Sequence, residues 1–253
     1  MKIFLSAVEG SEKHIIDRCI REGINLKYIL ISYFHLRKNE KIFNKLRLIC
    51  DEMLIDSGAH SFQKGFKVDF YEFTKEYAQW IIENDCDQMT GYFEMDIDNL
   101  IGYDEVKKLR AILEAAHPTK IIPVWHATRG VEEFEKMCEE YAGRIVAISA
   151  IRNKDISDDQ YMMFLKTAKK YGCKVHALGM TRTNLLNKVP FDYTDSSTWK
   201  QTGNYGGFAK FTGCKMKVVS AAGGLKTYYL DFHNLKEFMK MQQYFEAKYK
   251  HLE

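Results

Sequence analysis

The sequence predicts an α/β fold in which eight strands form a (β/α)8 barrel, or TIM barrel. Eight short β-rich runs recur along the chain, and amphipathic helical patterns lie between most of them. The chain has 253 residues, close to the roughly 250 residues that are usual for such a barrel. A doubly wound open sheet is the alternative that the same alternation allows.

The eight predicted strands are runs of aliphatic and aromatic residues that end in small or polar side chains. They cover residues 2–8, 27–32, 53–58, 89–96, 120–127, 144–150, 174–180 and 191–197. Runs of this length, bounded by turn-forming residues, are typical of strands.

Helical periodicity follows several of these strands. It covers residues 70–84, 103–116, 131–142 and 158–172. Ser157 stands before the acidic first turn of the 158–172 helix and Gly172 stands at its end, which are the expected start and stop signals.

The last part of the chain departs from the alternation. Residues 215–220, a Gly-Gly turn at 223–224 and residues 226–232 predict a β-hairpin, inserted at about 204–232. A final helix over 234–252 is expected to close the barrel. We therefore expect residues 1–253 to form a single barrel domain.

Composition indicates an ordinary globular protein, with 46% hydrophobic and 28% charged residues. The opening MKIFLSAVEG turns polar after Val8, unlike a signal peptide, and no apolar run reaches the roughly 18 residues of a membrane span. We therefore expect a cytoplasmic protein with no membrane partner. The six cysteines are far apart and form no CxxC pair, which favours scattered reduced thiols over a zinc site.

Charge is unevenly distributed. The net charge is +3, yet from residue 198 onward nine lysines stand against four acids. A basic carboxyl-terminal part indicates either a polyanionic partner or a solvated lysine face.

Acidic side chains follow three of the predicted strands. Asp56, Asp96 and Asp195 each stand at a strand end, and Asp98 follows Asp96 closely. A barrel enzyme builds its active site from the carboxyl ends of its strands. Because like charges raise one another's pKa, three converging carboxylates are costly unless they serve a function. We therefore predict a shared acidic site at the barrel mouth.

Acids alone leave the reaction open. Paired carboxylates can carry out glycosyl transfer, or they can bind magnesium for phosphoryl chemistry. The sequence contains no phosphate-binding glycine loop, no HExxH and no GxSxG. The pattern therefore predicts an acidic mouth with an undetermined reaction.

Taken in order, the strand ends resemble the tRNA-guanine transglycosylase superfamily, over roughly residues 50 to 200. The nearest resemblance is to the short DpdA-type DNA-guanine transglycosylases of phages and bacteria. LIDSGAHSFQ (54–63) is similar to the family's D-S-G-G-F-Q, and GYFEMD (91–96) to its base-reading strand. VWHA and AISAI (147–151) correspond to V-Q-G and A-I-G-G-L. HALGMTRTNLLNKVPFDYTDSSTW (176–199) is similar to the segment that carries the catalytic aspartate.

The resemblance implies catalytic roles for two aspartates. Asp195 would be the nucleophile that attacks C1′ of a guanosine, and Asp56 would move protons or orient the sugar. A 7-deazaguanine base such as preQ0 would then displace the covalent aspartyl intermediate. The reaction would have the two-step logic of a retaining glycosidase.

The resemblance also implies a base-binding set. Asp96 would accept hydrogen bonds from guanine N1–H and its exocyclic amine, and His126 would stand where the family has glutamine. Leu178 would pack on the base. The remaining substrate-binding positions are Ser57, Ser149, Ala150 and Gly179, with backbone N–H groups of 149 and 150 directed at the base O6.

Departures from the family pattern favour DNA over tRNA. Enzymes acting on tRNA carry a C-x-C-x2-C…His zinc site, whereas only Cys214, His233 and His251 follow the catalytic strand here. His60 and Ser61 interrupt the first motif. No cofactor is therefore expected, and zinc least of all. In a phage-encoded protein the location would be the host cytoplasm.

A DNA substrate implies phosphate contacts and a guanosine that leaves the base stack. The predicted contacts are Arg152, Arg182, Lys200, Lys210, Lys215 and Lys217, with Lys154 as a further candidate. The aromatic residues Trp199, Tyr205, Phe208 and Phe211 would stack on splayed bases or pack on the barrel.

Three alternatives stay open. The same chemistry could act on tRNA, the chain could be a non-catalytic nucleic-acid-binding relative, or it could be a magnesium-dependent hydrolase. An accessory protein or a second copy of the chain is also left open as a partner.

Overall fold

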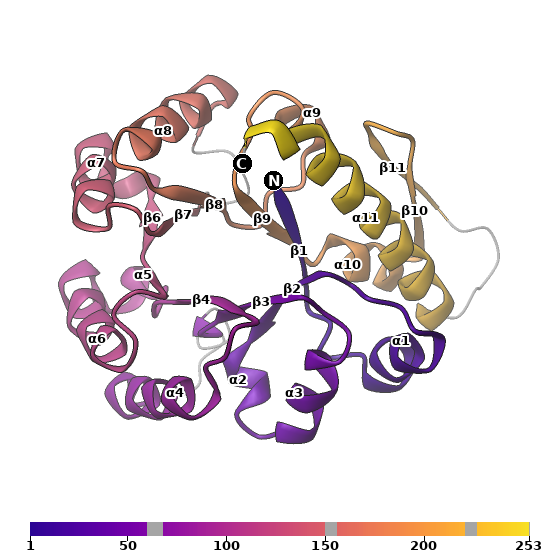
Figure 1. The fold of residues 1–253 in the computed structure, drawn as a ribbon, viewed down its shortest axis with the longest axis horizontal. Helices are drawn as coiled ribbons and strands as arrows, with labels where there is room; N and C mark the ends of the chain where they lie inside the picture. Colours follow the sequence, from indigo (N-terminus) through magenta and orange to yellow (C-terminus); the bar gives the residue numbers. More distant parts are fainter. Residues whose placement is uncertain (60–67, 150–155, 221–226, 253) are drawn as a thin grey trace.

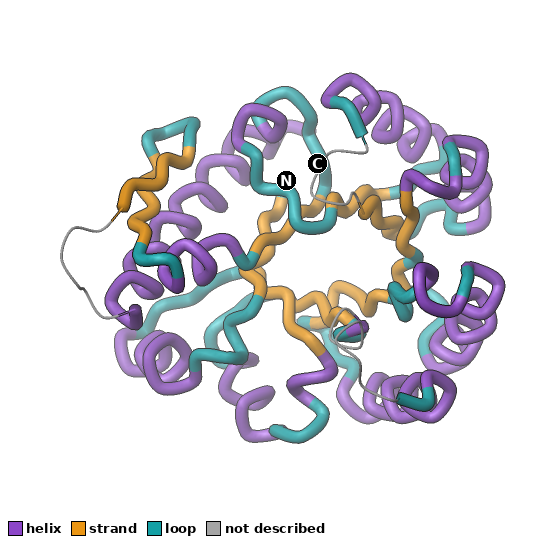
Figure 2. The backbone as a smooth tube through the Cα atoms, turned by 180° about the vertical axis from the view of Figure 1, so that it is seen from behind, coloured by secondary structure: helices purple, strands orange, loops and turns teal. Residues whose placement is uncertain are grey.

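A ring of short parallel strands surrounded by helices is the main feature of the computed structural model (Figures 1 and 2). The structure describes residues 1–59, 68–149, 156–220 and 227–252. Within them a nine-stranded sheet curves into a nearly closed barrel, in the order β5-β4-β3-β2-β1-β9-β8-β7-β6. A two-stranded antiparallel hairpin lies outside the ring. The predicted barrel with a hairpin near the carboxyl terminus is therefore confirmed.

The barrel strands coincide with the eight predicted β-rich runs. They are β1 (Lys2–Ser6), β2 (Tyr28–Ser32), β3 (Glu52–Asp56), β4 (Met89–Phe93), β5 (Ile121–Ile122), β6 (Val124–His126), β7 (Ile145–Ser149), β8 (Lys174–Ala177) and β9 (Tyr193–Ser196). One run, 120–127, contributes two strands.

The helices surround the strands and supply the outer layer. They are α1 (Asp17–Glu22), α2 (Tyr33–Leu36), α3 (Glu40–Arg47), α4 (Phe70–Asn84), α5 (Asp98–Ile101), α6 (Tyr103–Ala116), α7 (Val131–Glu140), α8 (Asp158–Lys170), α9 (Thr183–Leu186), α10 (Thr198–Asn204) and α11 (Thr227–Tyr249). A π-helical turn (Glu12–Ile16) precedes α1, and 3-10 turns cover Ala127–Arg129 and Lys250–Leu252. No helix in the described ranges is long and apolar enough to cross a bilayer.

Local capping explains where two long helices begin. The Asp69 carboxylate accepts hydrogen bonds from Tyr71 N and Glu72 N at 3.0 and 3.1 Å at the start of α4. Ser157 and Gln160 form a capping box at the start of α8. Gly172 adopts a φ of 71° just after α8, where a left-handed residue suits a helix end.

Proline divides the strand at which the barrel closes. Pro123 separates β5, which pairs with β4, from β6, which pairs with β7. Backbone hydrogen bonds from Glu94 N to Ile122 O and from Ala147 N to Pro123 O continue the ladder on the two sides. The same short segment therefore joins both edges of the sheet.

A buried ion pair stabilises this closure. Val124 N donates to Glu94 Oε1 at 2.6 Å, and Arg110 Nε donates to Glu94 Oε2 at 2.6 Å. Both charged side chains are almost fully buried between the barrel and α6. Arg110 also donates to the hydroxyl groups of Tyr103 and Tyr141 at 3.2 Å.

One strand of the hairpin lies where the sequence predicted it, at 215–220, and the other does not. Its strands are β10 (Gly207–Phe211) and β11 (Met216–Ser220), paired antiparallel. The assignment of 226–232 to a strand was wrong, because α11 begins at Thr227. Its buried residues follow helical spacing from Leu230 onward, and this packing outweighs the β preference of the tyrosines. The predicted turn at 223–224 lies outside the described residues.

Asn234 attaches the hairpin to the helical layer. This fully buried side chain accepts a hydrogen bond from Ala209 N at 2.7 Å. It donates to Trp199 O at 3.2 Å and to Gly207 O at 3.1 Å. One amide group therefore joins α10, β10 and α11.

We expect Arg110→Met to destabilise the protein by about 3–5 kcal/mol, because it leaves the Glu94 carboxylate buried without its partner charge. Urea unfolding measures the change. Lys108→Met is the matched control, since Lys108 lies on the same helix in an exposed pair with Glu105 and should cost less than about 1 kcal/mol. Equal losses in the two variants would contradict the role of the buried pair.

Candidate active site at the barrel mouth

Strand alternation directs two of the predicted acids toward the barrel axis. Leu54 and Tyr193 pack in the cluster that fills the barrel interior. Asp56 and Asp195 stand two residues further along the same strands, and residues two apart share a face. Both carboxylates therefore lie at the carboxyl-terminal end of the barrel, facing inward.

Three hydrogen-bond donors hold the Asp195 carboxylate. Ser6 Oγ donates to Oδ2 at 2.8 Å, and Gly179 N donates to Oδ1 at 2.9 Å. His176 Nε2 lies 3.0 Å from the same Oδ1. The donors come from β1, β8 and the turn after β8, so tertiary contacts on both sides of β9 orient this group. These contacts fix the orientation of the Asp195 carboxylate.

His176 lies beneath Asp195 in the barrel interior. It is fully buried and packs edge-on to Phe93, with its ring parallel to that of Tyr193. Its Nδ1 has no hydrogen-bond partner among the described residues. Because an ionised carboxylate only accepts, the contact assigns the proton to Nε2. His176 therefore supports Asp195 from below.

Asp56 is the acid with the most altered proton affinity. Burial raises its pKa to about 7, against the opposing hydrogen bond from Gly58 N at 2.9 Å. The negative charges of Asp96, Asp195 and Glu9 raise the pKa further. A carboxyl group with a pKa near neutrality can both give and take a proton at pH 7.

Glu9 adds a fourth carboxyl group that sequence reasoning missed. Its Oε1 lies 3.4 Å from Ser32 N, and its Oε2 is buried without a partner among the described residues. Burial raises the pKa of Glu9, while the charges of His35 and Lys200 lower it. Ser32 faces Asp56 across β2 and β3, and its hydroxyl is likewise buried and unpartnered.

His126 and Asp96 form the opposite part of the mouth. His126 Nε2 lies 2.5 Å from Asp96 Oδ1 and 3.7 Å from Asp98 Oδ1. Burial lowers the pKa of His126, but the bond to Asp96 and the charges of both aspartates outweigh it and raise the pKa overall. Arg129 forms an ion pair with Asp98 at 2.8 Å.

Asp96, Asp98 and His126 could also hold a metal ion. One ligand atom from each lies within 4.8 Å of the others, the one such group in the described ranges. Carboxylate and imidazole ligands suit several divalent ions. In this structure Asp96 is paired with His126, and Asp98 is paired with Arg129.

The other predicted base-binding residues are placed as follows. Ser149 ends β7 directly beside His126, and half-buried Leu178 packs against the interior cluster. Ser57 is fully buried, with a hydroxyl that lacks a partner among the described residues. Gly179 uses its N–H to hold Asp195. Ala150 lies outside the described residues.

The predicted phosphate contacts differ in their surroundings. Lys210, Lys215 and Lys217 are exposed on the hairpin. Exposed Arg182 pairs with Asp158 at 3.1 Å, whereas Lys200 reaches inward and donates to Ala7 O at 3.2 Å. Arg152 and Lys154 lie outside the described residues.

The predicted aromatic contacts separate into two kinds. Trp199 is fully buried and donates its indole N–H to Ser6 O at 2.9 Å, so it supports the mouth from behind and cannot stack on a base. Phe208 packs against His233, and Phe211 packs against Tyr244. Tyr205 is 89% exposed and is available for contact.

Sequence signals for the missed residues were present but weak. Ser6 ends the first strand, and Glu9 follows it by three residues. His176 stands within a strand at an inward position. Each would have been found by listing every polar inward position at the carboxyl-terminal ends, and not only the acids that directly follow a strand.

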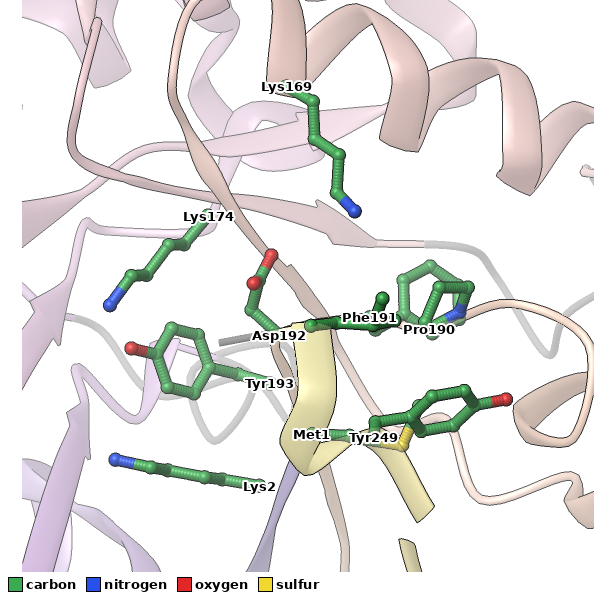
Figure 3. Close-up of a pocket in the computed structure, with 10 residues that line it drawn as sticks. Met1, Lys2, Lys169, Lys174, Pro190, Phe191, Asp192, Tyr193 and Tyr249 are labelled. Atoms are coloured by element: carbon green, nitrogen blue, oxygen red, sulfur yellow. The ribbon is translucent and has the colours of Figure 1, made fainter. Parts of the chain in front are cut away.

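A separate cavity of about 270 Å³ lies at the opposite end of the barrel (Figure 3). Lys2, Lys174 and Tyr193, which line it, are the first residues of their strands. The Asp192 carboxylate lies between Lys169 and Lys174, whose charges lower its pKa, although burial raises it overall. The predicted acids are absent from this lining. Barrel enzymes use the other end, so this cavity is not the candidate active site.

Comparison with known proteins supports the fold and leaves the family open. No protein-family model matches the chain, and no curated protein is similar to it in sequence. One similar solved structure, from Coccidioides immitis, is described as a fructose-1,6-biphosphate aldolase by assignment only. Its TM-score is 0.53 and its sequence identity is 11%, over 98% of this chain and 88% of that chain. A mutant tryptophan synthase α-subunit from Pyrococcus furiosus has a TM-score of 0.50 and 12% identity, over 97% and 95%. The chain thus has a TIM-barrel fold of the kind shared with enzymes.

We expect Asp56→Asn to make the protein more stable at pH 8 than the wild type. Below about pH 4 the wild-type acid is protonated in both states. As the pH rises toward about 7, Asp56 ionises in the unfolded chain before it ionises in the folded protein. The free energy of unfolding of the wild type therefore falls by up to about 4 kcal/mol relative to that of the variant, and above this range the difference stays constant.

Urea unfolding of both proteins between pH 4 and 8 measures this difference. Asp87→Asn, at an exposed position, reports the effect of the same chemical change away from the mouth. A difference between wild type and Asp56→Asn that does not grow with pH would contradict the assignment.

Proposed function

We propose that the chain is a base-exchange glycosyltransferase that replaces guanine in DNA with a 7-deazaguanine base. The reaction would proceed through a covalent glycosyl ester on Asp195. The observation that carries the proposal is the three-donor cradle around the Asp195 carboxylate at the mouth. The order of motifs along the chain and the TIM-barrel fold also support it.

In the first step an Asp195 oxygen attacks C1′ of the target nucleoside. A C1′–O bond forms, the C1′–N9 bond breaks, and its electron pair leaves with guanine. The leaving base takes up a proton, and Asp56 suits this role because its pKa of about 7 keeps much of it protonated at neutral pH. Serine, histidine and glycine donors keep the nucleophile oriented.

In the second step the incoming base reverses these changes. Asp56, now ionised, accepts the proton from N9 of the 7-deazaguanine. N9 forms the new bond to C1′, and the Asp195 ester bond breaks to restore the carboxylate. The retaining outcome follows from two successive displacements at one carbon.

Recognition of the base falls to Asp96 and His126. Asp96 Oδ1 is bonded to His126, so its Oδ2 is the oxygen available to the donor groups of guanine. A His126 with a raised pKa can donate to Asp96 and hold it in place. Leu178 supplies an apolar surface beside them.

DNA is favoured over tRNA as substrate by the carboxyl-terminal part of the chain. Where family enzymes acting on tRNA bind zinc, this chain forms the β10–β11 hairpin, with exposed Lys210, Lys215 and Lys217. His233 packs against Phe208 and is hydrogen-bonded to Ala209 O at 2.9 Å. Its ring thus supports the hairpin.

We expect Asp195→Asn to lower incorporation of radiolabelled preQ0 or guanine into DNA by at least about a thousand-fold, because the nucleophile is lost. Its amide oxygen can still accept two of the three hydrogen bonds, so the variant should fold. Label counting on DNA and on tRNA, with nucleoside mass spectrometry, gives the measurement.

Asp192→Asn is the matched control, since Asp192 lies three residues away at the opposite end of the barrel and should keep wild-type activity. Equal labelling by Asp195→Asn and wild type would refute the mechanism. Labelling of tRNA but not of DNA would show that tRNA is the substrate in place of DNA.

A further inference from the structure

A basic groove lies on the outside of the barrel, between α1 and the start of α11. Its lining residues are Lys13, His14, Arg18, Arg21, Glu22 and Tyr228, and its volume is about 260 Å³. His14, Arg18 and Arg21 are four and three residues apart, so they share one face of the helical segment that begins at Glu12. None of these residues belongs to the mouth.

Aromatic rings form a stack at this groove. The rings of His14 and Tyr228 lie 4.9 Å apart at an interplanar angle of 18°. Tyr229 lies 4.2 Å from Tyr228 and is 56% exposed. An exposed aromatic stack offers π-faces to a planar ligand.

Cations surround the stack. Lys13 and Arg21 are exposed and form no ion pair with any residue that the structure describes. Arg18 lies 3.6 Å from the centre of the Phe232 ring and pairs with Glu22 at 2.7 Å. Lys236 lies 4.7 Å from the same ring. Among the residues that line the groove, three cations, Lys13, Arg18 and Arg21, therefore stand against one acid, Glu22.

Lys200 connects this surface to the mouth. Its charge acts on Glu9, which lies beside Asp56, and on Asp231 in the first turns of α11. The charge of His14 also acts on Asp231. Lys200 Nζ also donates to Ala7 O at 3.2 Å, and Ala7 directly follows Ser6, which donates to Asp195. The helix that carries Lys200, α10, packs against α11 beside Asp231, three residues after Tyr228.

We propose that this groove, which we call the α1–α11 groove, binds the single-stranded DNA that flanks the reacting nucleotide. The inference rests on the proposed function, which supplies a DNA substrate with a nucleotide at the mouth. Phosphates would pair with Lys13 and Arg21, and an unstacked base would lie on the exposed ring of Tyr229, at the end of the stack. Stacking platforms bordered by cations are the usual means of binding single strands. In a duplex the base faces are stacked on one another, so a duplex cannot make the stacking contact with the tyrosine.

Fluorescence anisotropy with a labelled 12-nucleotide DNA strand tests the proposal without requiring turnover. We expect Tyr229→Ala to weaken binding about ten-fold, because it removes the ring on which one base stacks. The double variant Lys13→Gln/Arg21→Gln should reduce the salt dependence of log K by about 1.4, which corresponds to two phosphate contacts on a single strand.

Two controls isolate the groove. Tyr71→Ala removes an exposed tyrosine on α4, and Lys136→Gln removes an exposed cation on α7; both should bind as the wild type does. Circular dichroism and urea unfolding check that each variant is folded.

The proposal is overturned if the wild type does not bind the strand, or if Tyr229→Ala binds as tightly as the wild type. It is also overturned if a duplex of the same sequence binds equally well, or if poly-glutamate competes as effectively as DNA. Groove-dependent binding without base exchange would support the groove and count against the proposed function alone.

Discussion

Closure of the barrel depends on one buried ion pair. Pro123 interrupts the strand at which the two edges of the sheet meet, and Glu94 accepts the Val124 N–H just beyond it. Arg110 neutralises this carboxylate in a site from which water is excluded. A buried carboxylate without such a partner is costly, so the closure needs α6 packed against the strands. The positions of all the strand ends follow from that closure.

The mouth contains more negative charge than a folded protein tolerates without compensation. Asp195 is compensated by three donors, and Asp96 by His126. Burial raises the pKa of Asp56 to about 7, against a single hydrogen bond from Gly58 N. An acid with a pKa near neutrality beside a firmly held carboxylate is the arrangement that the proposed glycosyl transfer would use.

The outer surface complements this arrangement. Lys200 donates to Ala7 O beside the acidic mouth, and its charge acts on Glu9 and on Asp231 of α11. A polyanion would be repelled by the acids alone. If the substrate is DNA, as proposed, cations outside the mouth would hold its phosphates and only the reacting nucleotide would approach the carboxylates.

Local sequence patterns were enough for the strand and helix order, for the barrel, and for Asp56 and Asp195 as inward acids, because alternation and strand ends are set by neighbouring residues. Contacts between distant segments were not predictable in this way. Ser6 and Asp195 are 189 residues apart and meet only after β1 pairs with β9. The inward His176, the Glu94–Arg110 pair and the early start of α11 likewise depend on which surfaces pack together. Packing can override local preference, as the tyrosines of α11 show, and only the folded chain determines it.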